Sequence, residues 1–439
     1  MSDVIVMGGG LAGMSTAAAL ASAGYEVSLF ESKPFLGGRA TSFPFSSGHG
    51  AAEHIDNCQH ILLRCCINLL DFYRRLGVEN RIQFYRRFQF IEPGGRISVL
   101  EAGALPPPFH FASSFFHLHF LTLAEKAAVI RGLVAIRRGN HRDLDRITML
   151  DWLRAKRQPQ RTVDRFWRQV LISAVNEELD RMAASFGIQV FQLGFLKDAR
   201  SSEMGIPSVP LAELYGAVSW DRLPNVRVHL GCPVEGIVSN TDFVSGIIAG
   251  STKRSADFYV CALPLERAAA MAPELELPVG QFQYSPITAI HIWFDRPVTD
   301  LPHAALLDRT IQWLFNKSGG SYLQLVVSAS RGLLHKTRSE VITLALQELE
   351  EFLPSVRHAT VLKAHVIKEA RATFSASPGL GVFRPPAQTR FRNFFLAGDW
   401  TQSGWPATME GAVRSGYMAA EAVTRAAGGP VKFLLPDPD

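Results

Sequence analysis

Four residues with reactive side chains alternate along one short segment of the sequence. His54, Asp56, Cys58 and His60 occupy every second position. In an extended strand, alternate side chains point to the same face, so this spacing predicts that the four groups share a face. Imidazole, carboxylate and thiolate groups are all metal ligands, which makes a metal site one interpretation. The alternatives are a structural role at strand ends and a place in the wall of a reaction centre.

A glycine-rich turn near the start of the chain predicts a nucleotide site. Residues 4–7 and 27–30 read as strands, with an Ala- and Leu-rich helix between them. The three glycines of a GxGxxG pattern provide a tight turn, a close approach to pyrophosphate and close packing of helix on strand. An acid at the end of the second strand would accept hydrogen bonds from ribose hydroxyls. The cofactor contacts predicted here are Gly8, Gly10, Leu11, Ala12, Gly13, Glu31 and Ser32.

Two further segments extend this nucleotide pattern. FLGGRATSF, at residues 35–43, supplies a second close backbone approach and a cation that suit an extended dinucleotide. Residues 394–423 read as a short apolar strand, a loop and a helix with small residues along one face. The N-terminus of that helix favours negative charge and would stabilise a bound cofactor whose ring carries a negative charge. The contacts predicted in the first of these segments are Gly37, Gly38 and Arg39, and the family resemblance described next adds Gly398, Asp399, Pro406, Ala407 and Met409 in the second.

The pairing of GGR near the start with LAGD and PATMEGA near the end resembles the superfamily of flavin amine oxidases, protoporphyrinogen oxidases and phytoene desaturases. The resemblance implies FAD, with Asp399 at its ribityl and pyrophosphate region and the backbone of residues 407–409 at its pyrimidine ring. It also implies that Val234, in the segment 226–237 read as a strand, clamps the adenine, and that residues 257–264 return to the sheet. The loop TQSGWP contains no cysteine, so we expect the FAD to be non-covalent.

The same resemblance gives the alternating segment a place beneath the flavin ring. It implies that residues 56–60 line the flavin face, with Asn57 and Gln59 as cofactor contacts. We expect His60 to be the proton donor, because its ordinary pKa lies near neutral pH. Asp56 would orient a neighbour, and Cys58 has either a chemical or a purely steric role. No metal is expected on this interpretation.

Two segments narrow the resemblance to one branch. HIDNCQHILLRCCINLLDFYRRLGV and FQFIEPGGR resemble the hydroxysqualene dehydroxylases of hopanoid biosynthesis. This implies an oxidoreductase that transfers hydride from reduced FAD to an allylic carbon of hydroxysqualene and releases squalene and water. The alternatives are carotenoid or phytoene desaturation, amine oxidation, and a non-enzymatic flavin-binding role.

The chain is long enough for two domains. We predict an α/β fold: a Rossmann-like FAD-binding domain of the amine oxidase or phytoene desaturase type from residues 1–70, 206–274 and 386–430, and an α+β substrate domain from residues 71–205 and 275–385. Residues 431–439 read as an irregular tail. The segment CINLLDFYRRLGV, residues 66–78, reads as a helix, and Cys65 and Cys66 at its start read as small core residues.

The composition suggests where the protein works. Hydrophobic residues make up 47% of the 439 residues, and the net charge is +5. No nucleic-acid-binding module is visible. The five cysteines form no CxxC pair, which is typical of free thiols in a reducing compartment. The Phe-rich residues 109–120 suggest an apolar entry for an isoprenoid substrate at a membrane surface. We therefore expect a cytoplasmic protein, without a leader or a spanning segment, that is peripheral at the inner face of the membrane.

Overall fold

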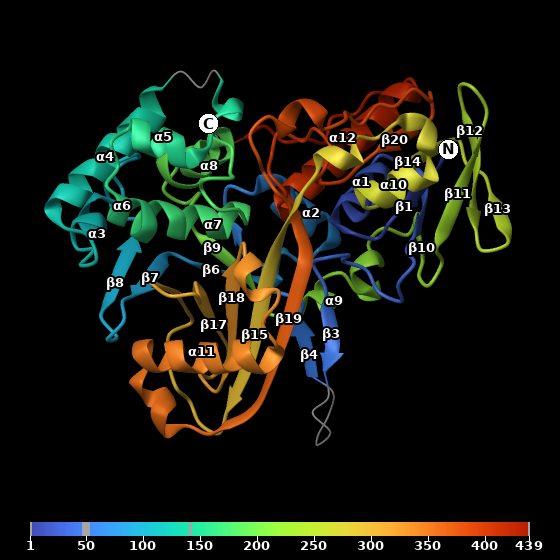
Figure 1. Ribbon diagram of the computed structural model, residues 1–439. Helices are drawn as coiled ribbons and strands as arrows, with labels where there is room; N and C mark the ends of the chain where they lie inside the picture. The colour runs from blue at the N-terminus through green and yellow to red at the C-terminus, as the bar shows by residue number, and fades with distance from the viewer. Residues whose placement is uncertain (1, 46–52, 140–142, 438–439) are drawn as a thin grey trace.

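The computed structural model describes residues 2–45, 53–139 and 143–437. Figure 1 shows a parallel sheet with its helices on one side of the molecule and a larger, mostly antiparallel sheet on the other. The long strands β15 (Tyr284–Phe294) and β19 (Val361–Phe374) of the larger sheet extend from it toward α12. The mixed α/β architecture predicted from the sequence is confirmed.

The parallel sheet has five strands in the order β10, β2, β1, β14, β20. Its neighbours are all paired in parallel. Their bounds are β1 (Asp3–Met7), β2 (Glu26–Phe30), β10 (Val226–His229), β14 (Phe258–Cys261) and β20 (Phe394–Leu396). The central and far strands β1, β14 and β20 are largely apolar, as in a sheet covered on both faces, whereas β2 (EVSLF) and the edge strand β10 (VRVH) alternate.

Two helices from opposite ends of the chain pack together beside this sheet. They are α1 (Leu11–Ser22) and α12 (Met409–Ala426). The Thr16 hydroxyl donates to the Gly416 carbonyl across the contact at 3.1 Å. A Cβ on Gly416 would lie 2.2 Å from Ser15 Oγ, so only glycine permits this approach. The small residues of both helices therefore hold the two halves of the nucleotide pattern together.

The second sheet has seven strands in the order β19, β15, β18, β17, β16, β7, β8. Besides β15 and β19, these are β7 (Arg87–Ile91), β8 (Ile97–Glu101), β16 (His303–Leu306), β17 (Trp313–Ser318) and β18 (Tyr322–Ser328). One face packs against α11 (Arg338–Phe352) through aliphatic residues such as Ile290, Leu325 and Leu349. The alternate residues of the same strands, among them His291 and Gln324, point to the other face.

The remaining elements join or cover the two sheets. A helical layer contains α3 (Ala112–Phe116), α4 (Leu123–Arg138), α5 (Met149–Ala155), α6 (Gln160–Thr162), α7 (Gln169–Val175) and α8 (Ala184–Phe191). Three further helices are α2 (Ile67–Leu76), α9 (Leu211–Leu214) and α10 (Leu265–Met271). The small sheets are β3 (Ser42–Phe45) with β4 (Glu53–Asp56), β5 (Leu62–Leu63) with β9 (Met204–Pro207) and β6 (Ile82–Tyr85), and β11 (Val234–Ser239) with β12 (Val244–Ala249) and β13 (Thr252–Arg254).

Three predicted elements differ in the structure. Residues 226–237 form two strands, β10 and β11, because Gly231 adopts φ +63° and turns the chain between two sheets. Strand β4 ends at Asp56, so the alternation does not continue to His60. Helix α2 begins at Ile67, with Cys66 as its N-cap residue rather than inside the helix. Each error is one of boundary, where periodicity carries least information.

The C-terminal segment has no helix or strand over residues 431–437 but is attached to the core. Phe433 is buried against Tyr417, with ring centroids 6.4 Å apart. The Leu435 N–H donates to Asn68 Oδ1 at 2.8 Å, and Arg414 pairs with Asp437 at 2.8 Å. Irregular backbone is therefore held here by side-chain contacts.

Candidate active site

The three glycines of the GxGxxG turn that follows β1 have different surroundings. Gly8 adopts φ +107°, and a Cβ there would lie 2.7 Å from the Ala262 carbonyl oxygen. A Cβ on Gly13 would lie 1.9 Å from the Gly8 carbonyl oxygen. Gly10 is different, because its backbone is extended and a Cβ there would meet no protein atom within 4 Å among the described residues. The first two glycines are needed by the fold, and the space in front of Gly10 is available to a ligand.

Both carboxylate oxygens of Glu31 accept hydrogen bonds, and one of them binds the glycine turn. The Gly9 N–H donates to Oε2 at 2.7 Å, and the Lys33 N–H and Ser32 hydroxyl donate to Oε1 at 2.8 and 3.1 Å. Oε1 uses both of its lone pairs in this way, but Oε2 accepts only one hydrogen bond, so Glu31 keeps the capacity to accept from a sugar hydroxyl through Oε2. The Cys232 N–H donates to the Glu31 carbonyl, and this brings the start of β11, with Val234, close to the same end of the sheet.

The GGR segment lies against the glycine turn. The Gly37 N–H donates to the Gly9 carbonyl at 2.9 Å. A Cβ on Gly38, which adopts φ +63°, would lie 3.1 Å from the Gly10 Cα. Gly9 and Gly10 thus lie against Gly37 and Gly38, which follow 28 positions later in the chain. The four glycines form one continuous backbone surface around the open space at Gly10.

Arg39 and Asp399, both predicted as cofactor contacts, form an ion pair. Arg39 Nη2 lies 2.6 Å from Asp399 Oδ2, and Arg39 Nη1 donates to the Ala372 carbonyl. The Asp399 carboxylate raises the pKa of Arg39. Sequence reasoning missed Arg384, which is buried and donates to the Asp399 carbonyl and to Ser403 Oγ. Burial lowers the pKa of Arg384 to about 10.

The alternating segment is divided by the end of β4. His54 is exposed, whereas Asp56 is 4% exposed. Asp56 Oδ1 accepts from Ser42 Oγ at 2.7 Å and from the first N–H of α9, that of Leu211, at 3.1 Å. Among the described residues, no group of three His, Cys, Asp or Glu side chains is arranged to hold a metal ion. Asp56 therefore orients a hydroxyl and a helix end.

Lys317, from β17, joins this segment to the seven-stranded sheet. Its ammonium donates to Asp56 Oδ2 at 3.2 Å and to Gln59 Oε1 at 2.9 Å. Asn57 donates instead to the Arg39 carbonyl at 3.1 Å. No spacing in the sequence indicates Lys317, because it lies 258 positions from Gln59 and only the folded sheet brings them together.

Burial sets the protonation of His60 and Cys58. It raises the pKa of the Cys58 thiol to about 12 and lowers the pKa of His60 below its ordinary value. His60 Nδ1 lies 2.8 Å from the Cys58 carbonyl oxygen, which can only accept. In the neutral ring the hydrogen is therefore on Nδ1, and Nε2 is free to accept. Cys58 is a neutral thiol near neutral pH, which favours the steric role over a nucleophilic one.

The N-terminal end of α12 supplies a second set of polar groups. Thr408 caps the helix by accepting from the Gly411 N–H at 3.0 Å. Glu410 is 1% exposed and accepts from Asn68 Nδ2 and the Leu69 N–H, both at 2.8 Å, at the start of α2. Burial raises the pKa of Glu410 to about 7. The buried Trp405 Nε1 has no hydrogen-bond partner among the described residues.

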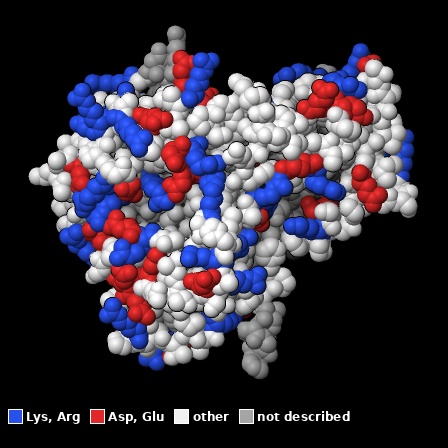
Figure 2. Space-filling model, in the orientation of Figure 1, with Lys and Arg blue, Asp and Glu red and all other residues white. Residues whose placement is uncertain are grey.

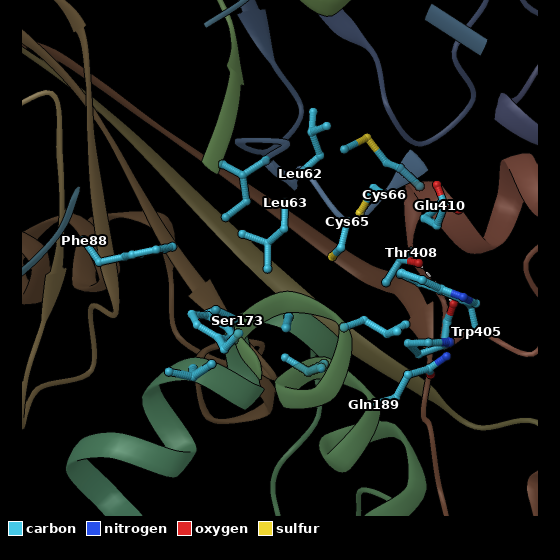
Figure 3. A pocket seen from close by; sticks show the side chains of 18 of the residues that line it. Leu62, Leu63, Cys65, Cys66, Phe88, Ser173, Gln189, Trp405, Thr408 and Glu410 are labelled. Atoms are coloured by element: carbon cyan, nitrogen blue, oxygen red, sulfur yellow. Dashed lines mark hydrogen bonds between the residues drawn. The ribbon is translucent and has the colours of Figure 1, made fainter. Parts of the chain in front are cut away.

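An apolar cavity of about 160 Å³ connects this end of α12 to the seven-stranded sheet. Figure 3 shows Trp405, Thr408 and Glu410 at one end of the cavity and Phe88 at the other. Phe90, Leu100 and Trp313 extend the wall on the sheet side, and Cys65 and Cys66 line it near α12. The two cysteines were predicted to be core residues; Cys65 is buried and Cys66 partly buried, and both also belong to the cavity wall.

These residues fit a bound dinucleotide. The open space at Gly10 is a cradle that a side chain would fill, and Glu31 stands at its edge with acceptor capacity remaining. Gly8, Gly37, Gly38, Arg39 and Asp399 surround the same end of the parallel sheet. The parallel sheet and this cradle are those of a dinucleotide-binding fold, and an apolar cavity lies at the start of α12.

The family is shown by a match over most of the chain. Residues 11–424 match the model of the flavin containing amine oxidoreductases, and the chain belongs to this family. A flavin is therefore its cofactor, and FAD is the form typical of the family. The protein is a flavin-dependent oxidoreductase.

Named relatives and solved structures are similar over nearly the whole chain. A probable zeta-carotene desaturase from Synechococcus elongatus is 25% identical, with 96% of this chain and 98% of the relative covered. A 15-cis-phytoene desaturase from the same organism is 26% identical, with 96% and 95% covered. The fold matches an oxidoreductase from Methanosarcina mazei at a TM-score of 0.71 and 19% identity, covering 94% of this chain and 98% of the other. Cyclohexylamine oxidase from Brevibacterium oxydans matches at 0.65 and 17%, covering 97% and 99%.

Proposed function

We propose that this protein transfers a hydride between FAD and a long isoprenoid chain. The observation that carries the proposal is the cavity between α12 and the seven-stranded sheet, whose wall consists mostly of aliphatic and aromatic side chains. Such a wall binds hydrocarbon by removing apolar surface from water. Glu410 is the one carboxylate among the described lining residues that could pair with the amino group of an amine substrate. FAD, held non-covalently at the Gly10 cradle, would supply the two-electron chemistry.

Two reactions of isoprenoids are compatible with this site. Desaturation of a carotenoid or phytoene removes a hydride and a proton from the chain, and the names of the relatives favour it. Reductive dehydroxylation of hydroxysqualene adds a hydride to the allylic carbon, while the C–O bond breaks and the oxygen leaves as water with one added proton. The resemblance of residues 54–78 and 88–96 to hydroxysqualene dehydroxylases favours this second reaction, and in it we propose His60 as the proton donor.

Anaerobic product analysis distinguishes the two reactions. Photoreduced protein is incubated with hydroxysqualene, and oxidised protein with phytoene and zeta-carotene, with an amine panel as the comparison. Squalene formed from hydroxysqualene supports dehydroxylation, and a product with additional conjugated double bonds supports desaturation. Turnover of amines alone would contradict the proposed substrate class.

We also propose that the outer face of α4 rests on an anionic membrane surface. Leu123 is 76% exposed, and Ile130 and Val134 follow on the same helix face at 39% and 43%. Arg137 and Arg138 are exposed beside this stripe, and Figure 2 shows basic side chains gathered over this part of the molecule. Apolar side chains next to cations match the interior and the headgroups of an anionic bilayer.

Vesicle flotation tests the membrane contact. No helix among the described residues is long and apolar enough to cross a bilayer, so binding through α4 would be peripheral. Wild type should float with vesicles that contain phosphatidylserine, and Ile130→Glu combined with Val134→Glu should remain at the bottom. Ile97→Glu, at an exposed apolar position on β8, is the matched control. Equal flotation of the α4 variant and wild type would contradict this contact.

A further inference from the structure

Two adjacent thiols lie in the wall of the apolar cavity. Cys65 and Cys66 both line it, and Figure 3 shows them on the wall between Leu63 and Glu410. Neighbouring residues of an extended strand point to opposite faces. Here the backbone turns instead. Cys66 adopts φ −77° and ψ 64°, and the Ile67 N–H donates to the Cys65 carbonyl at 2.9 Å, which is the geometry of an inverse γ-turn. The turn lets two consecutive side chains reach one cavity.

The two thiols are free, and their spacing disfavours a disulfide between them. The peptide bond that joins the two residues is trans, which sets their Cα atoms about 3.8 Å apart. Disulfides usually span about 4.4 to 6.8 Å between Cα atoms, so a bond between these neighbours would be strained. The hydrogen bond to Cys65 and burial raise the pKa of Cys66 well above its ordinary value. Cys66 is therefore a neutral thiol near neutral pH.

A neutral dithiol suits a soft atom that bonds to two sulfurs at once. The trivalent arsenic of an aryl arsine oxide is such an atom. Two As–S bonds form, both S–H bonds break, and the oxygen on arsenic leaves as water with the two thiol hydrogens. No oxidation state changes, so the reaction needs no oxidant or reductant. A bridging arsenic atom also places one more atom between the sulfurs, which removes the strain of a direct disulfide.

The space beside the thiols matches an aryl ring in size and polarity. The cavity has a volume of about 160 Å³ and an aromatic wall that includes Phe88, Phe90 and Trp405. Apolar cavities of about 150 Å³ bind benzene. Trp405 and Cys65 belong to the same buried apolar cluster, so a ring carried by an arsenic atom on the thiols would be in apolar surroundings.

We propose that Cys65 and Cys66 form a binding site for aryl compounds of trivalent arsenic, with the arsenic bridging the two sulfur atoms and the ring in the apolar cavity. The adduct blocks the cavity at its α12 end. The inference holds whichever substrate the cavity takes, because it rests on the two thiols and the shape of the cavity.

Intact-mass spectrometry of reduced holoprotein treated with phenylarsine oxide tests the dithiol site. Wild type should gain one phenylarsenic group in place of two hydrogens. Excess glutathione should leave the adduct intact and dimercaprol should remove it, because only a second dithiol competes with a chelate. Cys65→Ser and Cys66→Ser should each weaken binding about a hundredfold or more, the scale of a lost second attachment. Cys232→Ser, at a partly buried cysteine outside the cavity wall, is the matched control and should bind as wild type does.

Methylarsine oxide tests the place of the ring, because it offers the same arsenic without an aryl group. Wild type should bind the phenyl compound at least about tenfold more tightly than the methyl compound, since the ring removes apolar surface from water. Ala174→Phe, which fills part of the cavity, should reduce that preference and leave binding of the methyl compound unchanged.

Each outcome decides the inference. A wild-type adduct that glutathione removes, or an adduct that persists in both serine variants, overturns the dithiol site. Equal wild-type affinity for the two arsenic compounds, or a preference that is unchanged in Ala174→Phe, overturns the placement of the ring in the cavity.

Discussion

The carboxylates of the nucleotide end and the buried polar groups of the seven-stranded sheet differ in how they are paired. At the nucleotide end, Glu31 and Asp399 have partners within 2.8 Å before any ligand is considered. On the sheet floor, Gln324 and His303 have none among the described residues. Paired groups fix the shape of a cradle in advance, whereas unpaired ones become satisfied only when a ligand or water arrives. Under the proposed function, the first region would hold the resident cofactor.

The largest effect is expected from a side chain that fills the open space at Gly10. Gly10→Val should abolish FAD binding, because the side chain occupies space that no described protein atom fills. For the same reason the variant should fold, which circular dichroism checks. Gly236→Val, at another glycine with open space around it, is the matched control and should keep its flavin. Normal flavin absorbance in Gly10→Val would remove the basis of the cofactor assignment.

His60 tests whether the segment between the two regions takes part in chemistry. His60→Ala should slow single-turnover flavin reoxidation by hydroxysqualene roughly a hundredfold, the scale of a lost general acid. A donor must be protonated, and burial lowers the pKa of His60 below 6.5, so the wild-type rate should rise as the pH falls below that value. The variant should lose this dependence while keeping FAD. A wild-type rate in His60→Ala would mean that the proton comes from another group.

Glu410, at the cavity end of α12, makes stability depend on pH. Burial raises its folded pKa to about 7, above the ordinary 4.5, so the folded state holds the proton more tightly than the unfolded state does. The contribution of Glu410 to the free energy of unfolding should therefore be highest below pH 4.5. It should fall by about 3 kcal/mol as the pH rises from 4.5 through 7. Glu410→Gln should flatten the free energy of unfolding over this range. An unchanged slope would show that another group controls it.

Lys317 connects the two regions, and its loss should have the smallest effect. Lys317→Met leaves Asp56 Oδ2 and Gln59 Oε1 without their donor, which should cost about 1 to 2 kcal/mol in the free energy of unfolding. Arg87→Met, which removes an exposed pair with Glu101, should cost under about 1 kcal/mol. Denaturant unfolding of both variants makes the comparison, and equal costs would mean that Lys317 behaves as a surface charge.

The two regions also differ in what the sequence can predict. The turn at Gly8 to Gly13, the acid Glu31 and the helix start at Met409 lie in short segments whose spacing reflects local backbone geometry, and the structure brings these segments to one end of one sheet. Lys317, Gln324 and His303 lie on strands whose register is set by pairing across the sheet. Their isolated positions carry no spacing signal. The alternation at residues 54–60 predicted a strand that is too long for a related reason, because nothing in the alternation shows that the strand ends at Asp56.

The central claim is that an isoprenoid enters the apolar cavity and exchanges a hydride with the flavin there. Anaerobic rapid mixing of photoreduced protein with hydroxysqualene, and of oxidised protein with phytoene, tests it by recording the flavin spectrum. Ala174→Phe narrows the cavity from a lining position outside the nucleotide cradle, so it should keep FAD. We predict that wild-type flavin changes redox state with one of the two substrates and that the variant responds at least tenfold more slowly. A flavin that responds to neither substrate, or a variant as fast as wild type, would contradict the account.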